Sequence, residues 1–209
     1  MVDFKENEQL NTLNHSCAHV MAQAIKHLYP QAKFWVGPVV AEGFYYDVDL
    51  GDEVVSDEVI AKIEKEMKKI CKDGKRIVRR EISKEEALEM FKDDEYKLDL
   101  ISNLKDGTIT CYSQGDFTDL CRGPHVETVK MCKNFKLIKH SGAYWKGDKN
   151  NKVLQRIYGV CFPTAEELEE LDEVELFNNI EMPLVEVLSE MQYEGIQIDK
   201  EELEEFGQN

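Results

Sequence analysis

This 209-residue sequence contains two pairs of side chains that can bind a metal ion or a substrate atom, and the members of each pair are four residues apart. His15 and His19 share one face of a helix if the segment has 3.6 residues per turn. Cys121 and His125 have a Gly-Pro dipeptide between them, which excludes a regular helix and predicts a tight turn. Three imidazoles and a thiolate form the donor set of a tetrahedral zinc site, so we expect the two pairs to converge.

The segment around His15 and His19 predicts a long amphipathic helix. On a wheel of residues 10–28, the apolar stripe consists of Leu10, Leu13, Cys17, Val20, Met21, Ala24 and Leu28. The two histidines fall opposite this stripe, beside Ala18 and Ala22. Solvated faces normally carry Lys and Glu, so we expect the histidines to be presented in a shallow groove of small residues. The alternative is an ordinary solvated or core histidine pair.

Several motifs in fixed order give the sequence a family resemblance. They are His15-Ser-Cys-Ala-His19, Gly37-Pro38-Val39, Gly43-Phe-Tyr-Tyr-Asp47, Asp119-Leu-Cys-Arg-Gly-Pro-His125, and Ser141-Gly-Ala-Tyr-Trp145 through Leu154-Gln-Arg-Ile-Tyr-Gly159. Over about residues 10–162 the sequence resembles the editing domain of threonyl-tRNA synthetase. This is the second additional domain shared with alanyl-tRNA synthetase and with free-standing alanyl editing proteins.

The resemblance implies hydrolysis of the ester that joins a wrong amino acid, serine, to the terminal ribose of tRNA(Thr). One methyl group is worth only about 1–3 kcal/mol in a pocket, which is why a second site tests the amino acid again. The residues that match the family's catalytic positions are His15, Lys97 and Asp119, and those that match its substrate pocket are His19, Gly37, Tyr46, Cys121 and His125. His15 and Lys97 would form the catalytic pair, and Asp119 would hold the substrate's ammonium group or orient Lys97. Without the resemblance, Lys97 would be an exposed lysine on a strand.

By the same resemblance no metal is required, although zinc is possible. If His15, His19, Cys121 and His125 all bound zinc, the closed tetrahedron would leave no position for water. A nearby lysine ammonium would also oppose a dication. Two alternatives stay open: a zinc-dependent alanyl-type editing protein, and a zinc-stabilised tRNA-binding module without catalysis. The Arg-Gly-Pro-His and Gly-Phe-Tyr-Tyr-Asp motifs favour the threonyl branch. The expected partners are the acceptor end of tRNA(Thr) and, if the chain is a fragment, the rest of a threonyl-tRNA synthetase.

Charge and composition separate the chain into two parts. The net charge is −16, but residues 163–209 hold 16 acids and one base, so the first 162 residues are nearly neutral and can still meet RNA through local basic patches. No apolar run of membrane-spanning length and no signal peptide is apparent, and the six cysteines lack the spacing of a disulfide framework. We therefore expect a cytoplasmic protein without a membrane partner.

The remaining elements predict an α+β fold, in which a long N-terminal helix packs against an antiparallel sheet. Strands or hairpins are expected over residues 33–50, 76–82, 96–100, 108–117, 135–140 and 153–162, and helices over 56–71, with Ser56 as N-cap, and 83–91, with Ser83 as N-cap.

The acidic tail is expected to be a separate segment, giving an editing domain at 1–162 and a helical tail at 163–209. Residues 176–207 resemble the start of the polymerase domain of bacterial DNA polymerase I, without its catalytic motifs. A helix is expected after Pro183, where an apolar stripe begins. We interpret the tail as a foreign or fused segment without polymerase activity. Nothing after residue 162 resembles an aminoacylation core, so we expect no synthesis of aminoacyl-tRNA.

Overall fold

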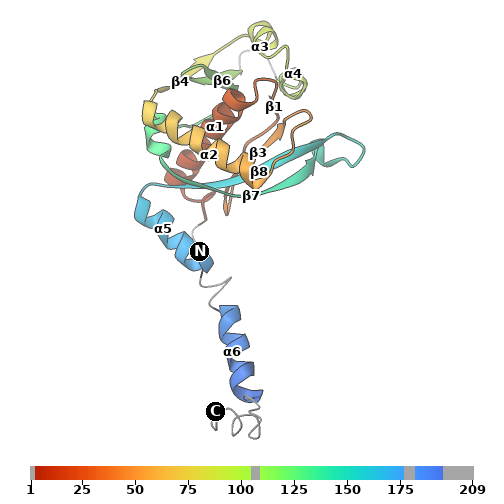
Figure 1. Cartoon of the computed structure of the whole chain (residues 1–209). Coiled ribbons are helices and arrows are strands. Elements are labelled where there is room, and N and C mark those ends of the chain that lie inside the picture. The colour runs from red at the N-terminus through yellow and green to blue at the C-terminus, as the bar shows by residue number, and fades with distance from the viewer. Residues whose placement is uncertain (1–2, 105–108, 177–181, 195–209) are drawn as a thin grey trace, which may run out of the picture. The chain divides into compact units, whose positions relative to one another are not determined.

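The structure, a computed structural model, describes residues 3–104, 109–176 and 182–194. The chain divides into two compact units, Met1–Leu168 and Glu169–Asn209. The first unit has the predicted α+β fold, with N-terminal helices packed on an antiparallel sheet and a second, smaller antiparallel sheet (Figure 1).

The larger sheet has the strand order β1-β3-β8-β7, and β2 pairs with β3. Its strands are β1 (Lys33–Phe34), β2 (Val39–Val40), β3 (Gly43–Asp49), β7 (Asn134–Tyr144) and β8 (Val153–Phe162). Gly159 lies at the centre, opposite Phe44 on one side and Leu137 on the other. A Cβ atom there would lie 2.6 Å from the Phe44 ring and 3.0 Å from Leu137, so only glycine lets these two side chains fill the core.

Two helices cover one face of this sheet. Helix α1 (Glu8–Leu28) begins at Asn7, whose side chain accepts from two backbone amides of the first turn. Helix α2 (Asp57–Asp73) begins after Ser56, whose hydroxyl accepts from the Val59 amide, and ends at Gly74 in the left-handed conformation. The cap predicted for this second helix is confirmed.

The prediction for α1 was wrong on one point, because its second face is buried. The apolar stripe is buried except for Leu28, and on the second face Ser16, Ala18, His19, Ala22 and Gln23 are buried while His15 is partly exposed. The helix contacts the large sheet and also strand β6 (Phe117–Leu120) of the small one. The wheel correctly placed the histidines opposite the stripe, but it could not reveal that a distant hairpin covers them.

The small sheet has the order β4-β5-β6, formed by β4 (Ile77–Glu81), β5 (Thr110–Gln114) and β6 (Phe117–Leu120). Helices α3 (Lys84–Met90) and α4 (Glu95–Ser102) lie between β4 and β5 in the chain. Ser83 caps α3 as predicted. The strand predicted over residues 96–100 was wrong: this segment is helix α4, because Asp94 accepts from the backbone amides of Tyr96 and Lys97 and starts a helical turn.

Two short 3-10 turns, Val129–Cys132 and Trp145–Gly147, flank β7. The acidic tail holds helices α5 (Ala165–Leu176) and α6 (Met182–Glu194), so the helix predicted after Pro183 is confirmed. The rest of the segment singled out at 176–207, namely residues 177–181 and 195–207, lies outside the described residues. No helix of the described chain is both long and apolar enough to span a membrane.

Candidate active site

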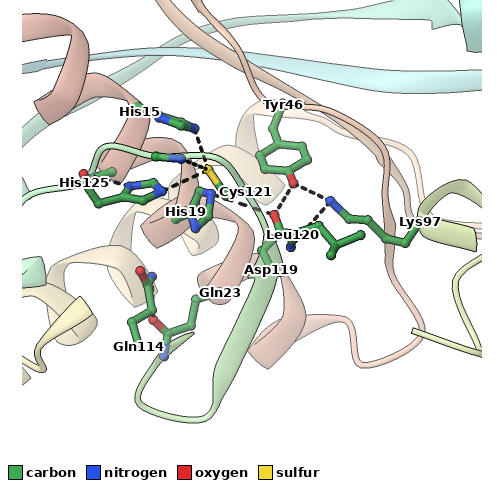
Figure 2. A network of polar contacts seen from close by, with 12 residues as sticks. His15, His19, Gln23, Tyr46, Lys97, Gln114, Asp119, Leu120, Cys121 and His125 are labelled. Carbon is green, nitrogen blue, oxygen red and sulfur yellow. Dashed lines mark hydrogen bonds and ion pairs between the residues drawn. The ribbon is translucent and has the colours of Figure 1, made fainter. Parts of the chain in front are cut away.

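Two elements that lie about a hundred residues apart bring the predicted side chains together. Helix α1 supplies His15 and His19, one turn apart, and the end of β6 supplies Asp119 and Cys121. The Cys121 amide donates to the Thr110 carbonyl at 3.1 Å, which continues the β5-β6 ladder by one residue. The predicted convergence of the two pairs is therefore present in the fold (Figure 2).

The Cys121 sulfur is the centre of the first cluster. Its Sγ atom lies 3.1 Å from Nε2 of His15 and 3.1 Å from Nε2 of His125, and the Gly123 amide donates to it at 3.2 Å. Between Cys121 and His125 the chain is not helical, as predicted, but it forms an irregular segment and not the expected tight turn. Gly123 is required in this segment, because its φ is +70° and a Cβ atom would collide with the Tyr112 hydroxyl.

Ser16, buried beneath the cluster, determines which nitrogen of His125 carries the proton. Its hydroxyl donates to the Thr12 carbonyl at 2.7 Å and accepts from the Val126 amide at 2.9 Å. The His125 Nδ1 atom lies 3.0 Å from the same oxygen. Because the single hydroxyl proton is used by Thr12, we assign the proton of this bond to Nδ1. The Nε2 atom of His125 then offers a lone pair to Cys121.

Burial keeps the imidazoles of this cluster neutral. It is the largest cause that lowers the pKa of His15, although a hydrogen bond to the Pro124 carbonyl partly opposes it. Burial, then repulsion by His15 and Lys97, lowers the pKa of His19 well below its ordinary value. Burial and the two neighbouring histidines lower the pKa of His125 to about 2, and burial raises that of the Cys121 thiol to about 11. A neutral imidazole can accept a proton from water near neutral pH.

The same four side chains form a group that could hold a metal ion. One ligand atom from each of His15, His19, Cys121 and His125 lies within 4.8 Å of the others. One thiol proton cannot satisfy both imidazole nitrogens that face Cys121, and Nδ1 of His19 is buried without a partner among the residues that the structure describes. Convergent nitrogen and sulfur donors with unused lone pairs suit zinc. The donor set therefore fits the ion that the sequence allowed.

A second cluster is built around Lys97. Its Nζ atom lies 2.6 Å from Oδ1 of Asp119, donates to the Tyr46 hydroxyl at 3.0 Å and to the Trp35 carbonyl at 3.2 Å. The Tyr46 hydroxyl in turn donates to the other oxygen of Asp119. The side chains of Lys97 and Asp119 are only 3% and 2% exposed. An ammonium group has three N–H donors, so all those of Lys97 are used.

Asp94 and Tyr96 explain how a lysine at the start of a helix becomes buried. The Asp94 carboxylate caps α4 and also accepts from the Phe34 amide at 2.8 Å, which attaches the helix to β1. The Tyr96 hydroxyl donates to Asp49 of β3 at 2.7 Å. These two anchors fix the first turn of α4 against the edge of the large sheet and aim Lys97 inward.

The two clusters meet at His19 and Asp119, where Nε2 and Oδ2 lie 4.0 Å apart. Gly37 borders the second cluster, because a Cβ atom there would lie 2.5 Å from the Tyr46 ring. All eight residues predicted for the site therefore lie in one region. A cavity of about 490 Å³ also has Lys97 and Asp119 in its wall, together with Phe34, Phe91 and Phe117.

Sequence comparisons agree with this geometry. Residues 109–158, which include Asp119, Cys121 and His125, match the family model described as the threonyl and alanyl tRNA synthetase second additional domain. The chain carries a threonyl/alanyl-tRNA synthetase second additional domain. The resemblance that the sequence motifs indicated is thus confirmed.

Relatives of this second additional domain are longer proteins. The chain is 52% identical over 178 residues to the threonine-tRNA ligase of Finegoldia magna, covering 83% of this chain and 28% of the relative. It is 51% identical over 164 residues to that of Desulfatibacillum aliphaticivorans, covering 78% and 26%. It is 54% identical over 156 residues to that of Staphylococcus epidermidis, covering 74% and 24%. The chain thus spans about a quarter of the length of these relatives. The first match must extend past Phe162, because residues 1–162 make up less than four fifths of the chain.

Three groups that orient the site were not among the predicted residues. Ser16 stands inside the His15-His19 motif, so its position was a signal that could have been used. Asp94 precedes a helix as a typical N-cap, and this signal was hidden by the alternation that suggested a strand. The Trp35 carbonyl carries no sequence signal, because a backbone acceptor looks the same at every residue.

Proposed function

We propose that this domain hydrolyses the ester of serine wrongly attached to tRNA(Thr), as the editing part of a threonine-tRNA ligase. The observation that supports it most is the pairing of a neutral, half-exposed His15 with a buried Lys97-Asp119-Tyr46 cluster in one site. A base and a positive group near the ester are what hydrolysis requires. We propose tRNA(Thr) as the substrate RNA because the relatives are named threonine-tRNA ligases.

In the proposed reaction His15 takes a proton from water as the water attacks the ester carbonyl. The leaving ribose oxygen then recovers a proton from the imidazolium. Lys97 would stabilise the negative charge on the carbonyl oxygen. Since its three donors are occupied, we expect the substrate to replace the Trp35 carbonyl, which is its longest bond at 3.2 Å. Asp119 and Tyr46 would hold the ammonium group in place during this exchange.

The proposed pocket for the amino acid lies among His19, Cys121 and His125. Nδ1 of His19 is buried and has no partner in the described part of the chain, so it could form a hydrogen bond with the serine hydroxyl. Threonine would add one methyl group, which a pocket lined by these three side chains would have to exclude. If zinc binds, the ligands would be His15, His19, Cys121 and His125, and the ion would supply a Lewis acid for hydrolysis only after one of these ligands gave up its position.

The test is a comparison of two charged tRNAs with the whole chain. We expect rapid deacylation of seryl-tRNA(Thr) and little deacylation of threonyl-tRNA(Thr). Equal rates on both would contradict the specificity, and no hydrolysis of either would favour a tRNA-binding module without catalysis. Hydrolysis of seryl-tRNA(Ala) in preference to seryl-tRNA(Thr) would favour an alanyl-type protein.

We also propose that hydrolysis does not require the acidic tail, and that the protein works in the reducing cytoplasm. The compact unit ends at Leu168, and all six cysteines are free. A chain that ends at Leu168 should keep the circular dichroism melt and the deacylation rate of the full chain. A lowered melting temperature would show that the tail contributes to the stability of the domain.

A further inference from the structure

One face of the large sheet carries a row of aromatic and cationic side chains. Residues 44, 46 and 157 point into the core beneath α1 and α2, so their neighbours Tyr45, Arg156 and Tyr158 point to the opposite face. Tyr45 is paired with Tyr158 across β3 and β8, and Tyr158 is paired with Lys139 across β8 and β7. We call these four residues the sheet-face row.

An irregularity in β7 brings the lysine into this row. The pairing of β7 with β8 shifts by one residue between Leu137 and Lys139. In a regular ladder Tyr158 would face Ile138, whereas the bulge places Lys139 opposite it. Its Nζ atom lies 4.8 Å from the centre of the Tyr158 ring. A bulge that exchanges an apolar neighbour for a cation beside an aromatic ring changes what this face can bind.

The two cations of the row differ in their freedom to move. Arg156 donates to both oxygens of the fully buried Asp47 at 2.7 and 2.8 Å, and its guanidinium lies 3.9 Å from the centre of the Tyr45 ring. This group is fixed and its charge is balanced. Lys139 is exposed and, within the described part of the chain, makes no ion pair. The row therefore has one planar cation that an ion pair fixes and one exposed cation that has no ion pair among the described residues.

We infer that the sheet-face row binds an unpaired segment of RNA. Lys139 can swing from the Tyr158 ring to a phosphate and so uncover the ring for a base, while the fixed Arg156 plane on Tyr45 offers a second stacking surface. Aromatic rings and guanidinium planes stack on any base, and the lysine adds a sequence-independent phosphate contact. A protein partner would gain little electrostatic attraction from Arg156, because Asp47 balances its charge. A base can still stack on the plane of the Arg156 guanidinium.

This inference rests on the proposed function, which makes an RNA the carrier of the substrate. Tyr45 and Tyr46 are adjacent, so the row and the hydrolytic site lie on opposite faces of one strand. An RNA whose charged end enters the site would then contact both faces of the sheet.

The first test measures binding of a labelled single-stranded RNA oligonucleotide without an amino acid to the whole chain by fluorescence anisotropy. Lys139→Gln should weaken binding and lower the slope of log K against log salt by about 0.7. Lys149→Gln, which removes the same charge from an exposed residue of the β7-β8 turn, should change neither. Tyr158→Ala should weaken binding on the order of tenfold. Tyr158→Phe, which keeps the aromatic ring, should bind like the wild type. Equal effects of the two lysine variants, or no effect of Lys139→Gln, would overturn the inference even if Tyr158→Ala failed to fold.

The second test separates this inference from the proposed function. A seryl ester of adenosine alone is too short to reach the sheet-face row. Lys139→Gln should hydrolyse this small ester at the wild-type rate but show a raised KM for seryl-tRNA(Thr). If this variant lost hydrolysis of both substrates, Lys139 would belong to the hydrolytic site, and the inference that the sheet-face row binds RNA would be wrong. If the wild type hydrolyses neither substrate, the proposed function is wrong. The binding experiment would still show whether the sheet-face row binds RNA.

Discussion

The two halves of the site reach the same place by different means. The histidine cluster comes from regular spacing on one helix and one turn, and its groups are held neutral by burial. The Lys97 cluster comes from three separate elements, α4, β3 and β6, and it holds an ion pair that is almost fully buried. Neutral side chains cost less to bury than charged ones, whereas a buried ion pair is stable only when both partners are present. The difference predicts that the two halves respond differently to mutation.

Breaking the ion pair should have the largest effect. In Lys97→Met the Asp119 carboxylate stays buried without its cation, so we expect a loss of about 3–5 kcal/mol in stability together with complete loss of deacylation. Thermal melts and seryl-tRNA(Thr) hydrolysis measure the two effects. The double variant Lys97→Met/Asp119→Asn removes the unpaired charge and should recover most of the stability but none of the activity. A single variant as stable as the wild type would contradict the role of Lys97 in neutralising this carboxylate.

Removing His15 should separate activity from stability. The imidazole is half-buried and uncharged, so His15→Ala should lower the deacylation rate by about 10²- to 10⁴-fold and leave the melting temperature nearly unchanged. His140→Ala, at an exposed position of β7, is the matched control and should keep full activity. If His15→Ala retained the wild-type rate, the proton acceptor would have to be another group of the site.

These contrasts also explain what the sequence could predict. The histidines, Cys121 and the caps of α2 and α3 depend on local spacing, so they could be located before the fold was known. The position of Lys97 depends on tertiary contacts of Asp94 and Tyr96 with β1 and β3, which no local pattern encodes. For that reason its segment was interpreted as a strand and its burial appeared only in the fold. The burial of His19 likewise needs the β5-β6 hairpin, which lies about ninety residues away in the chain.

His27 lies on α1 eight residues after His19, but its pKa is shifted in the opposite direction. Burial lowers its pKa, but hydrogen bonds at 3.0 Å to Asp116 and to Glu66 outweigh this and raise it. A raised pKa stabilises the fold below the ordinary value near 6.5 and ceases to do so as the pH rises through the raised value. The side chain of Asp116 is 72% exposed, so the contribution should stay below about 1 kcal/mol.

The measurement is the difference in melting temperature between wild type and His27→Gln at pH 6 and pH 9. We expect a larger difference at pH 6, and Asp116→Asn should remove part of it. A difference that grows toward pH 9 would mean that His27 stabilises the fold in its neutral form.

Metal removal should change the deacylation rate least of all these treatments. Metal addition should distinguish the two mechanisms most clearly. If the histidine cluster serves as a neutral base, dialysis against a chelator should leave the deacylation rate unchanged. Added zinc should then inhibit, because a closed tetrahedron of His15, His19, Cys121 and His125 would occupy the lone pair that accepts the proton. Cys121→Ser should weaken that inhibition by removing the sulfur ligand, and its rate without zinc provides the baseline. An enzyme of the zinc-dependent alanyl type would behave in the reverse way, since its rate would fall on chelation and return with zinc. Inhibition by zinc would mean that the histidine cluster supplies the base and the Lys97 cluster supplies the cation. Activation by zinc would mean that the histidine cluster performs the hydrolysis through a metal.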